Sequence, residues 1–346
     1  IGLMNAPTLD GEVWSGVNEA GFCIMNTASY NLREDQLDCQ MDREGEFMYH
    51  VLGQCANLQE FEAWIDTYPQ PWGVEANFGI IDAQGGAAYY EINNHRWIKY
   101  DVNEEANGYR VVTNFSFAGR YEDYEGWERY QTATAIMQEA FSREKEMTAI
   151  DALNLFSRKY RHEVLGVNYY QENAPQYIVD QDFIPRRITS AVVYFEGVKA
   201  GENPRQAVMW TALGYPACAV AIPLFVQPKH LPAYMLARDA KAAEGIGLHS
   251  EMCDASLRIK DQWAFPMHIS NGKRYVALQT ILVDNENKPA LMTCTNDVET
   301  KILSDFLPIY QQWTTGKISD KEFWKSYDNV ASGWMKTYYD FFRPYL

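Results

Sequence analysis

The sequence predicts a layered α+β fold, and three observations support this prediction. The chain has 346 residues, of which 47% are apolar and 22% charged, as is typical of a globular protein with a large core. The predicted elements follow the order strands, two helices, strands, helices, and they lack the regular alternation of a parallel βαβ sheet. Two blocks of strands, each covered by its own set of helices, predict a four-layer αββα sandwich.

The first block begins with a hairpin whose turn is at 18–21, because apolar runs flank an Asn-Glu-Ala-Gly sequence. Helical spacing follows at 47–52 and 58–65, and Asn57 is a predicted N-cap with Glu60 as its reciprocal partner. A meander with Gly-rich and Asn-rich turns comes next. Its strands are predicted at 77–82, 87–92, 95–100 and 109–113, the last ending at Asn114.

Apolar stripes then predict helices at 127–141 and 149–160. The second block of strands is predicted at 190–195, 207–211 and 217–225. Further along the chain we expect a helix at 231–243, a strand at 273–283 and a helical C-terminal part at about 297–346, capped by Asn296 with Glu299 three residues on. No internal repeat is present, so we expect residues 1–346 to form a single domain.

Charge and hydropathy exclude two classes of partner. The net charge is −16, and no basic cluster interrupts it, so nucleic acid would be repelled. No run of 18 apolar residues is present, so we expect no membrane span. The partner that we expect is a small molecule.

Local motifs for cofactors and metals are absent from the sequence. It contains no dinucleotide fingerprint, phosphate-binding loop or H-E-x-x-H sequence, and its six cysteines form no C-x-x-C pair. We therefore predict no cofactor and no metal site. Cys23 and Cys218 lie in apolar runs and are predicted to be buried packing residues.

Three segments in a fixed order resemble one enzyme group. Residues 16–26 resemble the G-x-N-E-x-G hairpin of choloylglycine hydrolases, penicillin V acylases and the acyltransferases that acylate 6-aminopenicillanic acid (peptidase family C45). Residues 76–91 look like the D-x-x-G hairpin of that group, which ends in Glu. Residues 111–115 are similar to its x-T-N motif at a strand end.

The resemblance implies the αββα sandwich of N-terminal-nucleophile (Ntn) hydrolases, and a hydrolase or acyltransferase acting on linear amide bonds of N-acyl compounds. In that group an N-terminal Cys attacks the amide carbonyl, and its own α-amine, with a pKa near 8, is the base. An acyl-enzyme forms and is resolved by water or another amine. Autoproteolytic processing and export to a bacterial periplasm or cell surface are implied only by such relatives.

The resemblance also transfers site residues. Asn114 matches the Asn whose side chain helps to form the oxyanion hole. Asn26 is a second oxyanion candidate, although Ala28 competes for that position. Arg187 matches an Arg that lines the site, and Arg186 competes with it.

The chain departs from the group in its nucleophile, because none of its six cysteines is terminal. Either the nucleophilic Cys and its strand lie upstream of Ile1, or they belong to a separate N-terminal fragment that binds this chain, or catalysis has been lost. The third case predicts an inactive Ntn-fold subunit for binding or assembly. A different enzyme that uses an internal thiol is a further alternative.

Overall fold

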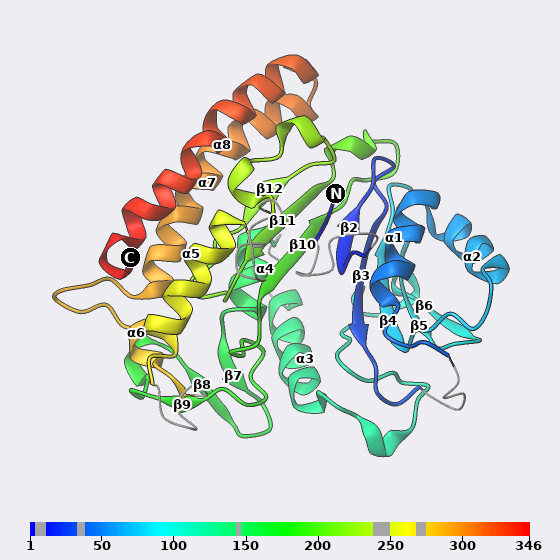
Figure 1. The fold of residues 1–346 in the computed structure, drawn as a ribbon, viewed down its shortest axis with the longest axis horizontal. Coiled ribbons are helices and arrows are strands. Elements are labelled where there is room, and N and C mark those ends of the chain that lie inside the picture. Colours follow the sequence, from blue (N-terminus) through cyan, green and yellow to red (C-terminus); the bar gives the residue numbers. More distant parts are fainter. Residues whose placement is uncertain (4–11, 33–38, 143–146, 238–249, 268–274) are drawn as a thin grey trace. The chain divides into compact units, whose positions relative to one another are not determined.

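A computed structural model describes residues 1–3, 12–32, 39–142, 147–237, 250–267 and 275–346. The fold is mixed α/β with several antiparallel sheets, as the sequence predicted at this level (Figure 1). The chain forms two compact units. Unit 1 comprises Ile1–Ala135 and Phe195–Met209, and unit 2 comprises Ile136–Tyr194 and Trp210–Leu346.

Unit 1 contains a six-stranded antiparallel sheet in which each strand pairs with the next one along the chain. The predicted hairpin and meander are therefore parts of one sheet. The strands are β1 (Gly2–Leu3), β2 (Ser15–Val17), β3 (Cys23–Ala28), β4 (Ala76–Ile81), β5 (Ala87–Ile92) and β6 (Trp97–Asp101).

Helices α1 (Glu44–Gln54) and α2 (Leu58–Thr67) cover one face of this sheet (Figure 1). Phe47 and Phe61 from these helices join Phe78 of β4 and Tyr90 of β5 in one buried core. The N-cap of α2 is confirmed, because the Asn57 side chain accepts from the Glu60 N–H at 2.9 Å. The returning bond differs by one residue, since Glu60 accepts from the backbone N–H of Ala56.

The remaining strands form three small sheets. A three-stranded sheet has the order β10-β11-β12, and the boundary between the units passes through β10 and β11. Two antiparallel pairs, β7 with β8 and β9 with β13, belong to unit 2. The bounds are β7 (Tyr160–His162), β8 (Val167–Tyr169), β9 (Ile178–Val179), β10 (Ala191–Glu196), β11 (Val208–Leu213), β12 (Ile222–Leu224) and β13 (Tyr275–Val276).

The longest helices of unit 2, α7 and α8, pack side by side (Figure 1). Tyrosines on α8 hold the apolar segment 217–224: the Tyr327 hydroxyl donates to the Pro223 carbonyl at 2.7 Å, and Tyr338 donates to the Cys218 carbonyl at 2.8 Å. The helices after α2 are α3 (Trp127–Phe141), α4 (Ala149–Phe156), α5 (Glu251–Ile259), α6 (Leu278–Leu282), α7 (Leu291–Thr314) and α8 (Asp320–Phe342).

Shorter helical turns connect these elements. A π-helical turn, Lys260–Ala264, continues α5. The 3₁₀ turns are Val102–Glu104, Tyr121–Asp123, Gln171–Asn173, Pro204–Gln206, Pro228–His230, Ala233–Met235 and Arg343–Tyr345.

Two predicted elements of the C-terminal half were wrong. Asn296 does not cap a helix, because α7 already begins at Leu291 and continues past it. Residues 273–283 are not one strand: β13 spans only Tyr275–Val276, and α6 follows at once. The partner of β13 is β9, which lies about a hundred residues away in sequence, so the pairing left no local signal.

Two further predicted elements also differ. The predicted strand at 109–113 has no strand partner among the described residues, because side chains of the unit 1 sheet hold the end of that segment. Of the predicted helix at 231–243, the described part forms only the 3₁₀ turn Ala233–Met235, and residues 238–243 lie outside the described residues.

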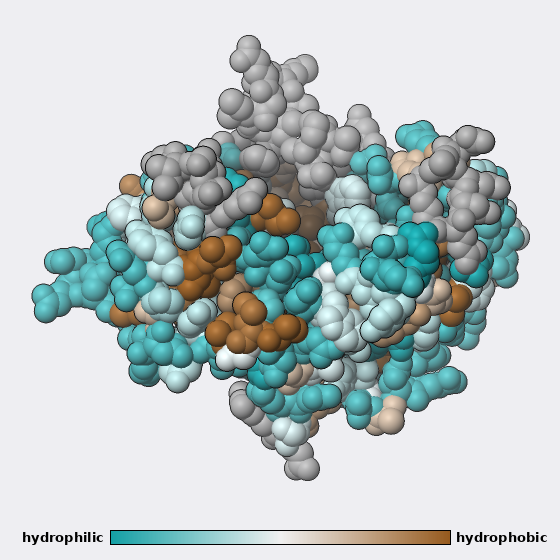
Figure 2. Space-filling view, turned by 90° about the horizontal axis from the view of Figure 1, so that it is seen from below, coloured by the Kyte–Doolittle hydropathy of each residue, from teal (hydrophilic) through white to brown (hydrophobic). Residues whose placement is uncertain are grey.

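The surface is mostly hydrophilic on the face drawn in Figure 2, with small apolar groups between the polar ones. This agrees with the large excess of acidic over basic residues, 46 against 30. Within the described ranges, no helix is both long enough and apolar enough to cross a membrane.

Candidate functional site

A segment with irregular backbone, 113–118, lies on the face of the unit 1 sheet opposite to α1 and α2. Thr27 of β3, Asn77 of β4 and Glu91 of β5 are aligned across the sheet by its register. The Thr27 hydroxyl donates to the Thr113 carbonyl at 2.7 Å, and Asn77 donates to the Phe115 carbonyl at 2.9 Å. The Glu91 carboxylate accepts from two successive backbone N–H groups, those of Phe117 and Ala118.

A buried polar network anchors the same segment. The Ser116 hydroxyl is within 2.5 Å of the Asn77 side-chain oxygen and 2.8 Å of the Ser29 hydroxyl. Asn31 accepts from the Ser116 N–H at 2.8 Å and donates to the Ser116 carbonyl at 2.8 Å. Because every one of these bonds is buried, moving the segment would leave several polar groups unpaired. The backbone segment that carries Asn114 is therefore rigidly held.

The Asn114 carboxamide is held at both ends. Its Nδ2 donates to the Ala28 carbonyl at the end of β3, at 3.1 Å, and its Oδ1 accepts from Arg129 Nη2 at 2.7 Å. Nδ2 carries two N–H bonds, and no second partner for it is found among the described residues. The side chain is half-buried. One oriented amide donor is thus left to meet a ligand.

Arg129 is an unusual residue for its position. It lies in the first turn of α3, where a cation is unfavourable to the helix dipole, yet its side chain is 8% exposed. Gly126 makes room for it, because a Cβ there would lie 2.6 Å from Arg129 Nη2, and its φ of +81° suits glycine. The charge-assisted bond from Arg129 polarises the Asn114 amide and strengthens its remaining N–H as a donor.

The structure does not bring Asn26 and Asn114 together. Asn26 pairs with Phe78, which pairs with Tyr90, and both aromatic residues point into the core beneath α1 and α2. Side chains of neighbouring strand residues alternate between faces, so Asn26 and Ala28 share the helix-covered face. The face that carries segment 113–118 is instead reached by Thr27.

Arg187 and Arg186 belong to unit 2. The backbone N–H of Arg187 donates to the buried Asp180, and its guanidinium lies 3.9 Å from Asp261. The Nε atoms of Arg186 and Arg187 are both buried without a hydrogen-bond partner among the described residues. Burial raises the pKa of Asp180, although the backbone N–H of Arg187 and both guanidinium groups act in the opposite direction.

None of the six cysteines forms a disulfide in the described structure. Burial raises the pKa of Cys23 and of Cys55 to about 12, that of Cys294 to about 12 and that of Cys253 to about 11. It raises the pKa of the fully buried Cys218 as well. The predicted burial of Cys23 and Cys218 is confirmed. A thiol that stays protonated at neutral pH is a poor nucleophile, so five of the six are unsuited to attack.

Comparison with known proteins assigns no family to this chain. No protein-family model matches the chain, and no curated protein sequence matches it. Within the part of the chain that the structure describes, no group of three or more His, Cys, Asp or Glu side chains could hold a metal ion.

Sequence reasoning proposed Asn114 as a candidate but missed the residues that hold its segment and side chain, above all Arg129 and Asn77. Each had a signal. Asn77 is a polar residue inside the apolar strand 76–81, and Arg129 places a cation at the wrong end of its helix. Neither signal names a partner, because the partners are 15 to 38 residues away in sequence.

Proposed function

We propose that this chain is the main part of an Ntn-type hydrolase or acyltransferase that acts on linear amide bonds of N-acyl compounds. The observation that carries the proposal is the Asn114 carboxamide, which is oriented by Arg129 and the Ala28 carbonyl with one N–H left over. The order of the three motif segments supports the same assignment. The four-layer sandwich and an exported location belong to this proposal.

In the proposed reaction, an N-terminal Cys upstream of Ile1 or on a bound fragment attacks the amide carbonyl. Negative charge then develops on the carbonyl oxygen, and the free N–H of Asn114 donates to it. Because the buried network anchors segment 113–118, this donor needs no reorganisation as charge develops. Arg187 stays a site-lining prediction from the resemblance, and Asn26 stays a prediction for which the sheet register gives no support.

N-terminal sequencing and intact-mass measurement of the mature protein test the nucleophile. A Cys at the first position, on this chain or on a tightly bound fragment, would support the proposal. A mature chain that begins at Ile1 and has no bound fragment would contradict it and would favour the inactive binding subunit. Rapid labelling of Cys39 by iodoacetamide at neutral pH, with loss of activity, would instead favour an internal thiol enzyme.

Substitution of Asn114 tests the oxyanion role. With an N-acyl amino acid, penicillin or conjugated bile acid that the mature protein turns over, Asn114→Ala should lower kcat by about 10²–10³, because one oxyanion donor is lost. KM should change little, since the interaction forms in the transition state. Asn107→Ala is the matched control, because Asn107 is exposed in the same unit. Equal kcat values for both variants and the parent would rule out the role.

A further inference from the structure

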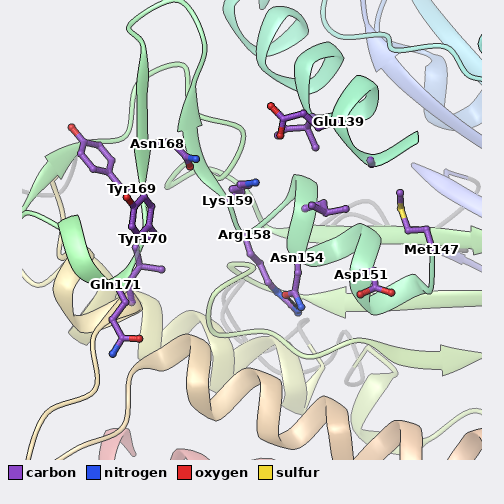
Figure 3. Close-up of a pocket in the computed structure, with 14 residues that line it drawn as sticks. Glu139, Met147, Asp151, Asn154, Arg158, Lys159, Asn168, Tyr169, Tyr170 and Gln171 are labelled. Carbon is purple, nitrogen blue, oxygen red and sulfur yellow. Dashed lines mark hydrogen bonds between the residues drawn. The ribbon is translucent and has the colours of Figure 1, made fainter. Parts of the chain in front are cut away.

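Unit 2 contains a cavity of about 620 Å³ that the proposed amide chemistry does not use (Figure 3). It lies among the second half of α3, the helix α4 and the end of β8. Five aliphatic residues line it: Ile136, Ala140, Met147, Leu155 and Leu282. Its volume and mostly apolar lining are typical of sites that bind small organic molecules.

Three of the four charged residues that line the cavity are already engaged by the protein. Arg158 donates all five of its N–H groups within unit 2, two of them to Glu299. Glu139 forms an ion pair with Arg161 at 2.7 Å. Asp151 accepts from the Thr148 hydroxyl and backbone N–H in the capping box of α4. Arg158 and Glu139 are thus paired with opposite charges, and the Asp151 carboxylate is hydrogen-bonded within the helix cap.

Lys159 is the exception. Its side chain is half-buried, and it forms no ion pair or hydrogen bond with any described residue. Figure 3 shows Lys159 between Glu139 and Asn168, whereas Arg158 points away toward Asn154. Asn168, Tyr169 and Tyr170, which carry neutral hydrogen-bonding groups, also line the cavity. The cavity thus combines an apolar body with one unpaired ammonium group.

We propose that this cavity binds a small organic anion with an apolar body, such as a medium-chain carboxylate. The carboxylate pairs with the Lys159 ammonium, and the hydrocarbon chain lies against the aliphatic residues of α3 and α4. An ammonium ion in a half-buried site gains more from an anion than it would in water, because solvent screens the pair less. This inference is independent of the amide proposal, since none of its residues belongs to the Asn114 site.

Isothermal titration calorimetry with octanoate, hexanoate, octanamide and octylammonium tests the proposal. Octanoate should bind, and hexanoate should bind about tenfold more weakly because it buries two fewer methylene groups. Octanamide should bind at least tenfold more weakly than octanoate, and octylammonium should not bind. Equal affinity for octanoate and octanamide would overturn the role of charge.

Variants locate the site. Lys159→Met should weaken octanoate binding at least tenfold without changing octanamide binding, and Lys159→Arg should retain octanoate. Ala140→Phe should weaken binding of both by placing a phenyl ring among the aliphatic residues that line the cavity. Lys321→Met, at an exposed lysine at the start of α8, is the matched control. Thermal unfolding checks that each variant folds. If Lys159→Met does not fold, octanoate binding by Lys159→Arg and Ala140→Phe tests the proposal. Unchanged octanoate binding by Ala140→Phe, or no binding by the parent, would refute the proposal.

Discussion

At the scale of single residues, Arg158 and Glu299 form a buried ion pair in unit 2 in which all five N–H groups of Arg158 donate hydrogen bonds. Their side chains are 1% and 0% exposed, and two hydrogen bonds of 2.7 and 2.6 Å join them. The other N–H groups of Arg158 reach the carbonyls of Pro216 and Ala219 and the Asn154 side chain. Glu299 also accepts from the Ala221 N–H at 2.8 Å. The pair thus ties α4 and α7 to the segment 216–221.

Removing one partner of this pair should be strongly destabilising. Glu299→Leu leaves the Arg158 charge buried and unpaired, and should lower the free energy of unfolding by about 3–5 kcal/mol. Denaturant unfolding followed by circular dichroism measures the loss. Lys301→Ala, which breaks the exposed pair with Asp305 on the same helix, should cost less than about 1 kcal/mol. A loss for Glu299→Leu no larger than that of this control would contradict the interpretation.

Among the elements, α1 shows how burial overrides a favourable local charge. Glu44 lies in its first turn, where the helix dipole favours a carboxylate, and its Oε1 accepts from the Glu75 N–H at 3.0 Å. Its side chain is nevertheless buried, and desolvation raises its pKa above the ordinary 4.5. Two residues on, Glu46 is partly exposed and hydrogen-bonds to Arg43, which lowers its pKa.

Glu44→Gln should therefore change the pH dependence of stability. Because the pKa is higher in the folded protein than in the unfolded chain, the folded protein binds the proton more tightly, and ionised Glu44 opposes folding at neutral pH. A glutamine at this position keeps the acceptor without the charge, so E44Q should be more stable than the parent at pH 7. The difference should shrink as the pH falls through the raised pKa and below about 4.5.

Denaturant unfolding of E44Q and the parent at pH 7 and pH 4 measures this difference, and Glu46→Gln supplies a control of opposite sign. The pKa of Glu46 is lowered in the folded protein, so its charge stabilises the fold above the ordinary pKa. E46Q should be slightly less stable than the parent at pH 7. The same sign for both variants at pH 7 would show that burial does not govern Glu44.

At the scale of the whole molecule, the net charge of −16 is the dominant electrostatic feature. Ion pairs such as Lys301 with Asp305 and Lys336 with Asp340 each join one positive and one negative charge, so they leave the overall excess of negative charge in place. Repulsion among like charges favours the expanded, unfolded chain. Added salt screens the charges and weakens that repulsion.

Raising NaCl from about 10 to about 150 mM at pH 7 should therefore raise the Tm, because the Debye length falls to about 8 Å. Scanning calorimetry at fixed buffer pH measures the shift. The same series in sodium acetate controls for a specific effect of chloride. A Tm that falls with either salt would mean that attractive surface pairs outweigh the net repulsion.

The sequence alone determined the elements whose signals are local. Apolar runs bounded by Gly-rich and Asn-rich turns predicted the hairpin and meander of unit 1, apolar stripes predicted α3 and α4, and the short-range Asn57–Glu60 pair predicted the start of α2. The mixed α/β class followed from their order. Only the tertiary structure decided that segment 113–118 is held by side chains instead of a strand partner, and that the Asn26 side chain lies on the sheet face opposite to this segment. It also revealed Arg129 behind Asn114 and the unpaired Lys159 in its cavity. The reason is physical: each of these features depends on a partner distant in the chain, and spacing within a short window carries no information about which distant groups folding brings together.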